Sequence, residues 1–172
     1  RCVTLNLKAV PDEKIKKFLM AHYQIPDYQA DVCVAFAQGN IGKAVQLATS
    51  DSFNEIKNSA LHLLKNVSKM EINDIIATVK SVSEFKIDIQ DYLDFLAVWY
   101  RDILYFKATR DSNGLIFKDE LNVITDQINK SSYEGIENIL RGLQTAKTRL
   151  NANVNFDLTM ELLFLLIKEN LV

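Results

Sequence analysis

Few side chains in this sequence have the chemistry and the spacing of a catalytic centre. The two histidines, His22 and His62, each lie near apolar residues on an expected helix. General acid–base catalysis or zinc binding needs partner groups at fixed spacings, and no His-Glu-x-x-His pattern accompanies either histidine. Cys33 lies between two valines, which is typical of a small buried side chain rather than of a nucleophile. We therefore interpret all three residues as structural, and we expect no metal site and no catalytic set within this chain.

The segment Gly-Asn-Ile-Gly-Lys-Ala at residues 39–44 combines two glycines with a cation. In one interpretation the glycines end one helix and begin the next, and Lys43 is a solvated charge. In the other, Gly39 and Gly42 allow a tight turn that directs Lys43 toward a neighbouring surface. The position of Lys43 does not decide between them. The sequence has no P-loop and no Gly-x-Ser-x-Gly motif, so we do not expect the chain to hold a triphosphate unaided.

Three basic residues, Arg141, Lys147 and Arg149, lie within residues 138–156, a stretch that contains no acidic residue. The favoured interpretation is a solvated helix face whose cations lie toward the negative C-terminal end of the helix dipole. The alternative is a local contact patch for another subunit or for nucleic acid.

The overall composition is that of an ordinary globular protein. Of the 172 residues, 48% are apolar and 24% are charged, which excludes wholesale disorder. The formal net charge of -2 gives no chain-wide attraction to DNA or acidic lipid. The longest apolar run, residues 162–167, is far shorter than the roughly 20 residues of a membrane-spanning helix, so we expect no membrane contact. Cys2 and Cys33 form neither a disulfide framework nor a Cys-x-x-Cys pair, which is typical of reduced thiols in a cytosolic protein.

The first 49 residues predict a strand followed by three short helices. The alternating residues 3–7 indicate the strand. Because a lone strand is unstable, we expect it to belong to the sheet of a longer protein that precedes residue 1. Pro11, followed by two acids, favours the start of the first helix, and Pro26 interrupts the chain between the first helix and the second. The helices are expected at residues 11–23, 27–38 and 41–49.

The remaining residues predict a larger bundle of amphipathic helices, joined to the first unit by a hinge near Ser50. Two capping boxes, at residues 52–55 and 131–134, indicate helix starts, and Asn155 is expected to cap the last helix. The apolar residues assigned to that last helix are Leu158, Leu162, Leu163, Leu165 and Leu166.

One helix of the bundle, residues 92–109, is apolar on two sides and is expected near the centre. The adjacent Arg101 and Asp102 on this helix are interpreted as a structural pair. An Asp-Ser-Asn-Gly turn at residues 111–114 indicates the longest loop. The predicted fold is therefore all-α, with a small three-helix unit followed by a five- or six-helix bundle.

Four features follow one another in a fixed order along the chain. They are Arg1-Cys2 before the strand, the segment at residues 39–44, Asp-Phe-Leu at 94–96 with Trp-Tyr-Arg-Asp-Ile-Leu at 99–104, and Asn-Val-Asn at 153–155 before the leucine-rich helix. In this order they resemble the delta-prime family of clamp-loader subunits of bacterial DNA polymerase III, and the related gamma/tau family is the nearest alternative. The resemblance covers essentially the whole chain.

The resemblance implies a three-domain parent protein. Residues 1–8 would be the tail strand of a missing AAA+ ATPase core, residues 9–49 the helical lid, and residues 50–172 the collar domain. Such collars join five subunits, delta-prime with gamma/tau and delta, into a cytoplasmic ring that loads the sliding clamp onto primed DNA. The fragment itself would not be an enzyme. Its parent would belong to the DNA polymerase III holoenzyme, a nucleotidyltransferase, with ATP bound at the interfaces of the ring.

The resemblance also implies roles for two cations. Arg1 matches an arginine finger that reaches the ATP of a neighbouring subunit. Lys43, in its setting of Gly39 and Gly42, matches a lid position that usually holds an arginine which senses the γ-phosphate. Lysine keeps the charge but lacks the planar fork of arginine, which suits a subunit whose nucleotide site is idle.

An alternative function also fits the helix pattern. The chain could be a free-standing helical regulatory or nucleic-acid-binding module, with Arg141, Lys147 and Arg149 as its contact patch. This alternative predicts an affinity for DNA that falls steeply with salt.

Overall fold

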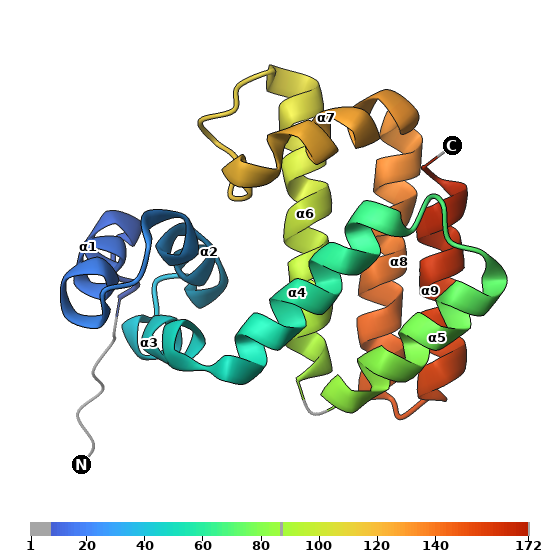
Figure 1. Cartoon of the computed structure of the whole chain (residues 1–172), viewed down its shortest axis with the longest axis horizontal. Helices are drawn as coiled ribbons and strands as arrows, with labels where there is room; N and C mark the ends of the chain where they lie inside the picture. Colours follow the sequence, from blue (N-terminus) through green and yellow to red (C-terminus); the bar gives the residue numbers. More distant parts are fainter. Residues whose placement is uncertain (1–7, 87, 172) are drawn as a thin grey trace, which may run out of the picture. The chain divides into compact units, whose positions relative to one another are not determined.

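The computed structural model describes residues 8–86 and 88–171, and all regular elements within these two ranges are helices (Figure 1). The all-α prediction is therefore confirmed. The predicted strand at residues 3–7 lies outside the described residues, as do Arg1 and Cys2. The chain divides into two compact units, residues 1–53 and 54–172, which we call the N-terminal unit and the C-terminal unit. Their assignment to a lid and a collar stays a prediction.

The N-terminal unit contains α1 (Asp12–Tyr23), α2 (Asp27–Ala37) and α3 (Ile41–Thr49), close to the predicted ranges. A proline directly precedes each of the first two helices, and Asn40 caps α3 by accepting a hydrogen bond from a backbone N–H in its first turn. Small and aliphatic side chains fill the interior of the unit. They are Ile15, Leu19, Ala30, Cys33, Ala37, Ala44 and Leu47.

The two glycines of the segment 39–44 have different structural roles. Gly39 has a φ of +83°, and a Cβ at this position would lie 2.5 Å from the Cβ of Ala9. Its carbonyl also accepts a hydrogen bond from the backbone N–H of Val10 at 2.9 Å. Gly42 lies exposed in the first turn of α3, where the atom nearest to an added Cβ would be Asn40 Oδ1 at 3.4 Å. The tight turn therefore needs a glycine at position 39 and not at position 42.

We expect Gly39→Ala to lower the free energy of unfolding of the N-terminal unit by about 2 kcal/mol, because left-handed backbone is costly for alanine and Ala9 must also shift. Gly42→Ala is the matched control. It should raise the same free energy by about 0.5–1 kcal/mol, since alanine favours a helix over glycine. Urea denaturation followed by circular dichroism measures both values. Equal effects of the two substitutions would contradict this assignment.

The helix that leaves the N-terminal unit is α4 (Asp51–Asn66), and it starts earlier than predicted. The predicted cap, Ser52, lies inside the helix; Ser50 instead accepts a hydrogen bond from the backbone N–H of Phe53 at 3.3 Å. The ring of Phe53 packs edge-on against Phe36 of α2, with ring centroids 5.7 Å apart. Phe53 is the last residue of the N-terminal unit, and this contact joins the first turn of α4 to that unit.

The C-terminal unit contains the rest of α4 and five further α-helices within the described residues. They are α5 (Ile72–Val82), α6 (Ile89–Thr109), α7 (Leu121–Lys130), α8 (Tyr133–Asn151) and α9 (Phe156–Glu169), with short 3-10 turns at Ser83–Phe85 and Lys118–Glu120. Helix α6 packs against α7 and α8, and α9 packs against α5 and α8 (Figure 1). Four aromatic side chains of α6 are fully buried, namely Tyr92, Phe95, Trp99 and Tyr100. The prediction that this helix is buried on two sides is confirmed.

Of the caps predicted for the last two helices, the one at α8 is wrong and the one at α9 is confirmed. At α8 the predicted cap, Ser131, is buried, and Ser132 instead accepts a hydrogen bond from the backbone N–H of Gly135 at 2.9 Å. Both serines have the right chemistry, and the buried position of the first leaves the second to cap the helix. At α9 the prediction is confirmed, since Asn155 Oδ1 accepts from the backbone N–H of Leu158 at 2.9 Å.

A buried chain of hydrogen bonds connects three helices of the C-terminal unit. Trp99 Nε1 on α6 donates to Gln127 Oε1 on α7 at 2.9 Å. The Nε2 of Gln127 donates in turn to the carbonyl oxygen of Leu64 on α4. Leu64 is among the last four residues of its helix, whose carbonyls lack partners within the helix. The side chain of Gln127 thus caps α4 from the interior.

Asp102 holds the loop that follows α6. Its carboxylate is fully buried, and Oδ2 accepts hydrogen bonds from the backbone N–H groups of Ile116 at 2.7 Å and Phe117 at 2.9 Å. Arg101 pairs with the other oxygen at 3.2 Å. Burial raises the pKa of the Asp102 carboxyl, although the two N–H groups and Arg101 act in the opposite direction. The sequence prediction of a structural Arg-Asp pair fits this geometry.

Tyr100 is expected to tolerate the loss of its hydroxyl group. The side chain is fully buried, and its hydroxyl has no hydrogen-bond partner among the described residues. We expect Tyr100→Phe to raise the free energy of unfolding of the C-terminal unit by about 1 kcal/mol, because a buried polar atom without a partner costs about 1–3 kcal/mol. Tyr105→Phe is the control, since the hydroxyl of Tyr105 donates to Asp111 Oδ2 at 3.3 Å. Thermal denaturation compares them, and a loss of stability in Tyr100→Phe would contradict the prediction.

Candidate docking groove between α8 and α9

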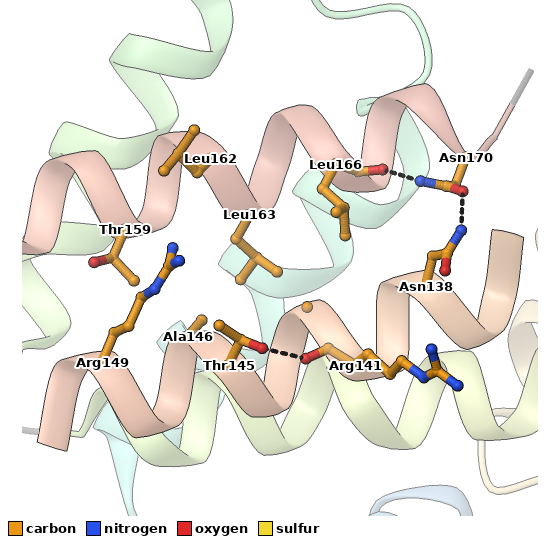
Figure 2. A pocket seen from close by; sticks show the side chains of 11 residues that line it. Asn138, Arg141, Thr145, Ala146, Arg149, Thr159, Leu162, Leu163, Leu166 and Asn170 are labelled. Atoms are coloured by element: carbon orange, nitrogen blue, oxygen red, sulfur yellow. Dashed lines mark hydrogen bonds between the residues drawn. The ribbon is translucent and has the colours of Figure 1, made fainter.

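An open groove of about 360 Å³ lies between α8 and α9 (Figure 2). The two helices are consecutive in the sequence, and one face of each lines the groove. The lining residues recur at spacings of three and four positions, which lie on the same side of a helix. The lining residues of α8 are Asn138, Arg141, Gly142, Thr145, Ala146 and Arg149, and those of the α9 segment are Thr159, Leu162, Leu163, Leu166 and Asn170.

Leucines and small side chains form the apolar part of the groove. A Cβ on Gly142 would lie 2.5 Å from Leu166 Cδ2, so the glycine lets Leu166 pack directly on the backbone of α8. Leu163 is buried beneath the groove, whereas 46% of Leu162 is exposed. Figure 2 shows these leucines on the strip of α9 that borders the groove. The groove therefore offers apolar surface to a partner.

All five leucines assigned to the last helix lie in α9, but they differ in burial. Of its five leucines, only Leu163 is buried; Leu158 is 53% exposed. The buried positions of α9 are Thr159, Met160, Leu163, Phe164 and Ile167. Because α9 packs against both α5 and α8, Leu158 and Leu162 lie outside its two contact faces.

Asparagine side chains close one end of the groove. Asn138 Nδ2 on α8 donates to Asn170 Oδ1 at 3.4 Å. Asn170 Nδ2 donates to the carbonyl oxygen of Leu166 at 2.8 Å, at the C-terminal end of α9 (Figure 2). The first bond links α8 to the C-terminal end of the α9 segment, and the second orients the side chain of Asn170.

The rim of the groove is cationic. Figure 2 shows Arg149 extending from α8 toward α9, and its guanidinium has no ion-pair partner among the described residues. Arg141 lies along α8, where it pairs with the exposed Glu137 at 2.6 Å. No acidic residue of the described part of the chain lines the groove. The groove thus combines apolar surface with two arginines.

The structure separates the three basic residues that the sequence grouped together. Arg141 and Arg149 both line the groove, but Lys147 points to a different helix and pairs with Asp94 of α6. The described structure thus brings two of the three cations to the groove, and their role as a contact patch stays a prediction. Sequence reasoning found two of the lining residues and missed the small ones, Gly142 and Ala146, whose spacing of four positions was the available signal.

The other predicted site cations, Arg1 and Lys43, belong to the N-terminal unit. Arg1 is outside the described residues, so its role as an arginine finger stays a prediction. Lys43 is half-buried in the first turn of α3, and its backbone N–H donates to Asn40 Oδ1 at 3.0 Å. Gly39 forms the turn just before it, whereas Gly42 has no strained backbone. The nucleotide-sensing role of Lys43 stays a prediction as well.

The two histidines and Cys33, the residues first considered as catalysts, make the contacts of structural or surface side chains. His22 is exposed, stacks on Phe18 with ring centroids 4.4 Å apart, and places Nδ1 3.2 Å from the carbonyl oxygen of Phe18. Cys33 is fully buried, as predicted. His62 borders an open depression of about 420 Å³ between α4 and α5. Asp74 also lines that depression, and its carboxylate accepts a hydrogen bond from the backbone N–H of Glu71, the N-cap residue of α5.

The described residues contain neither a metal-binding cluster nor a membrane-spanning helix. Residues 8–86 and 88–171 contain no group of three or more His, Cys, Asp or Glu side chains placed to hold a metal ion. None of the helices in these ranges has the length and apolar character needed to cross a membrane.

Comparison with known proteins relates this helical unit to a family. Residues 55–169, more than half of the chain and almost all of the C-terminal unit, match the family model described as DNA polymerase III, delta subunit, C terminal. A curated relative, "DNA polymerase III subunit delta'" of Bacillus subtilis (strain 168), is 25% identical over 172 residues. The match covers 98% of this chain and 51% of the relative, so the chain spans about half the length of that protein. No solved structure matches the chain. The chain belongs to the family formed by the C-terminal regions of DNA polymerase III delta subunits.

Proposed function

We propose that this chain is the C-terminal part of a delta-prime clamp-loader subunit, and that it helps assemble the ring that loads the sliding clamp onto primed DNA. The observation that carries the proposal is the coincidence of the family match, residues 55–169, with the compact C-terminal unit. The likeness of 98% of the chain to one half of a delta-prime subunit supports the same assignment. On this proposal the chain contributes contact surface to the assembly, and its partners are delta and gamma/tau subunits.

The groove between α8 and α9 is the proposed assembly surface. Exposed apolar surface of this kind marks protein–protein contact sites, and interfaces are enriched in arginine as well as in large apolar side chains. Leu162, about half exposed, and Arg149, without an ion-pair partner in the described chain, meet both criteria in one place. Burial of Leu162 by another subunit would remove its apolar surface from water and stabilise the ring.

The proposal extends to the whole parent protein through two cations of the N-terminal region. Arg1 would reach ATP bound to a neighbouring subunit, and Lys43 would occupy the lid position that senses the γ-phosphate. The parent would act in the cytoplasm as part of the DNA polymerase III holoenzyme and would contact clamp and DNA through the assembled ring. The resemblance of the whole chain to delta-prime subunits supports these proposed roles, since Arg1 and Lys43 lie outside the matched residues 55–169.

Size-exclusion chromatography with light scattering tests the assembly role. The purified chain is mixed with delta and gamma/tau subunits, and we expect it to elute in a stoichiometric complex with them. Leu162→Asp should prevent co-elution, because it places a carboxylate on the apolar surface of the groove. Lys130→Glu, at an exposed position of α7 outside the groove, is the control and should co-elute like the unchanged chain. Elution of the unchanged chain apart from both partners would refute the proposal.

A further inference from the structure

We propose that the groove between α8 and α9 receives a helix of a partner subunit on which two carboxylates, about two turns apart, flank an apolar side chain. This inference rests on the proposed function, since it takes the groove as an assembly surface. It adds the chemical identity of the occupant, which neither the family match nor the likeness to a delta-prime subunit supplies.

The charges at the groove select a partner that carries carboxylates. Arg149 extends toward α9 beside apolar side chains, and no acid of the described chain lines the groove (Figure 2). Covering the groove with a neutral surface would take this guanidinium out of water without a partner, which is costly. A carboxylate instead forms charge-assisted and often bidentate hydrogen bonds with arginine. The occupant should therefore supply an acidic side chain at this end.

The second arginine sets the spacing of the second carboxylate. Arg141 and Arg149 are eight residues apart on α8, which corresponds to about 12 Å along a helix axis. Arg141 now pairs with Glu137, but both side chains are exposed, and such surface pairs contribute only about 0–1 kcal/mol. Breaking the Arg141–Glu137 pair so that Arg141 can pair with a carboxylate of the partner therefore costs little free energy. A partner helix lying along the groove would carry its two acids seven or eight positions apart.

The floor of the groove selects the side chain between the acids. Leu162 and Leu166 lie between the two arginine ends, and Leu166 packs directly over Gly142 on the backbone of α8. An apolar side chain midway between the carboxylates would cover these leucines, in the manner of helix-in-groove recognition. Nucleic acid fits less well: no aromatic residue of the described chain lines the groove, so bases have no stacking surface there.

Two synthetic helical peptides test the inference directly. One carries Glu at two positions with the separation of Arg141 and Arg149 and Leu midway, and the other carries Lys in place of both Glu. NMR titration of the full chain measures the affinity and the residues affected. We expect the Glu peptide to bind at least about tenfold more tightly than the Lys peptide, with the largest shifts at Arg149, Leu162 and Leu166.

Charge reversal provides the decisive control. In the double variant Arg141→Glu with Arg149→Glu, the Lys peptide should become the tighter ligand, a result that simple unfolding cannot produce. Lys130→Glu, outside the groove, should leave the preference for the Glu peptide unchanged. The inference fails if the peptides bind equally or not at all, or if the shifts fall outside the groove. It also fails if an oligonucleotide displaces the Glu peptide, or if a second copy of the chain occupies the groove.

The peptide titration and the co-elution test separate two kinds of failure. Co-elution with delta and gamma/tau, together with no preference between the peptides, would overturn the inference about the occupant and leave the assembly role in place. Absence of co-elution would refute the assembly role itself.

Discussion

Asp102→Ala is expected to lower the free energy of unfolding of the C-terminal unit by about 3 kcal/mol, because it leaves one buried and one half-buried N–H group without an acceptor, each at a cost of about 1–3 kcal/mol. The N–H groups belong to Ile116 and Phe117, and Phe117 is itself buried against Phe95 and Trp99. Release of this loop would therefore loosen the aromatic packing on α6. Urea denaturation followed by tryptophan fluorescence measures the change.

Asp102→Asn is the matched variant for the same site. Its amide oxygen replaces the carboxylate oxygen that accepts both N–H groups, so most of the stability should remain. Burial raises the pKa of the Asp102 carboxyl in the folded state above its ordinary value in the unfolded state. The stability that comes from this pKa difference is fully present below the ordinary pKa, and it is lost as the pH rises through the raised pKa of the folded state. The aspartate protein should therefore lose stability relative to Asp102→Asn as the pH rises. Equal losses for the alanine and asparagine variants would contradict the role of Asp102 as an acceptor.

Gln127→Leu is expected to lower the free energy of unfolding by about 2–4 kcal/mol, because it leaves both Trp99 Nε1 and the carbonyl oxygen of Leu64 without their partner. The two side chains are similar in volume, so the effect reports on hydrogen bonding rather than on packing. Chemical denaturation measures the loss.

A double-mutant cycle tests whether these groups act as one network. Trp99→Phe removes the donor to Gln127, so the combination of Trp99→Phe with Gln127→Leu should cost less than the sum of the two single substitutions. Ser81→Ala, at an exposed position of α5, is the control and should change stability little. Additive losses for Trp99→Phe and Gln127→Leu would show that the two side chains are not coupled.

Periodicity predicted most of the fold because it reports directly on burial. The doubly apolar helix at residues 92–109 is the buried α6, and the three short helices of the first unit lie within a residue or two of their predicted ranges. Periodicity does not identify the capping residue where two serines lie close together in sequence. Ser50 and Ser52, or Ser131 and Ser132, have the same hydroxyl chemistry, and tertiary packing decides which of them lies at the helix end.

The candidate groove could be predicted only in part. Basic composition singled out Arg141 and Arg149, but the sequence does not say that Lys147 turns to Asp94 on another helix. The exposure of Leu162 depends on which faces of α9 are covered by α5 and α8, which is a property of the packed unit. The resemblance stated from the motifs agrees with the family match over residues 55–169.

Site-specific photo-cross-linking tests the central claim that this chain acts through the groove between α8 and α9. Photoreactive p-benzoylphenylalanine replaces Leu162 in one sample and Asn113, a loop residue outside the groove, in another. After mixing with delta and gamma/tau subunits and irradiation, mass spectrometry identifies the linked chains. We expect position 162 to cross-link to another subunit and position 113 to remain unlinked. A complex that forms while position 162 stays unlinked would contradict the claim.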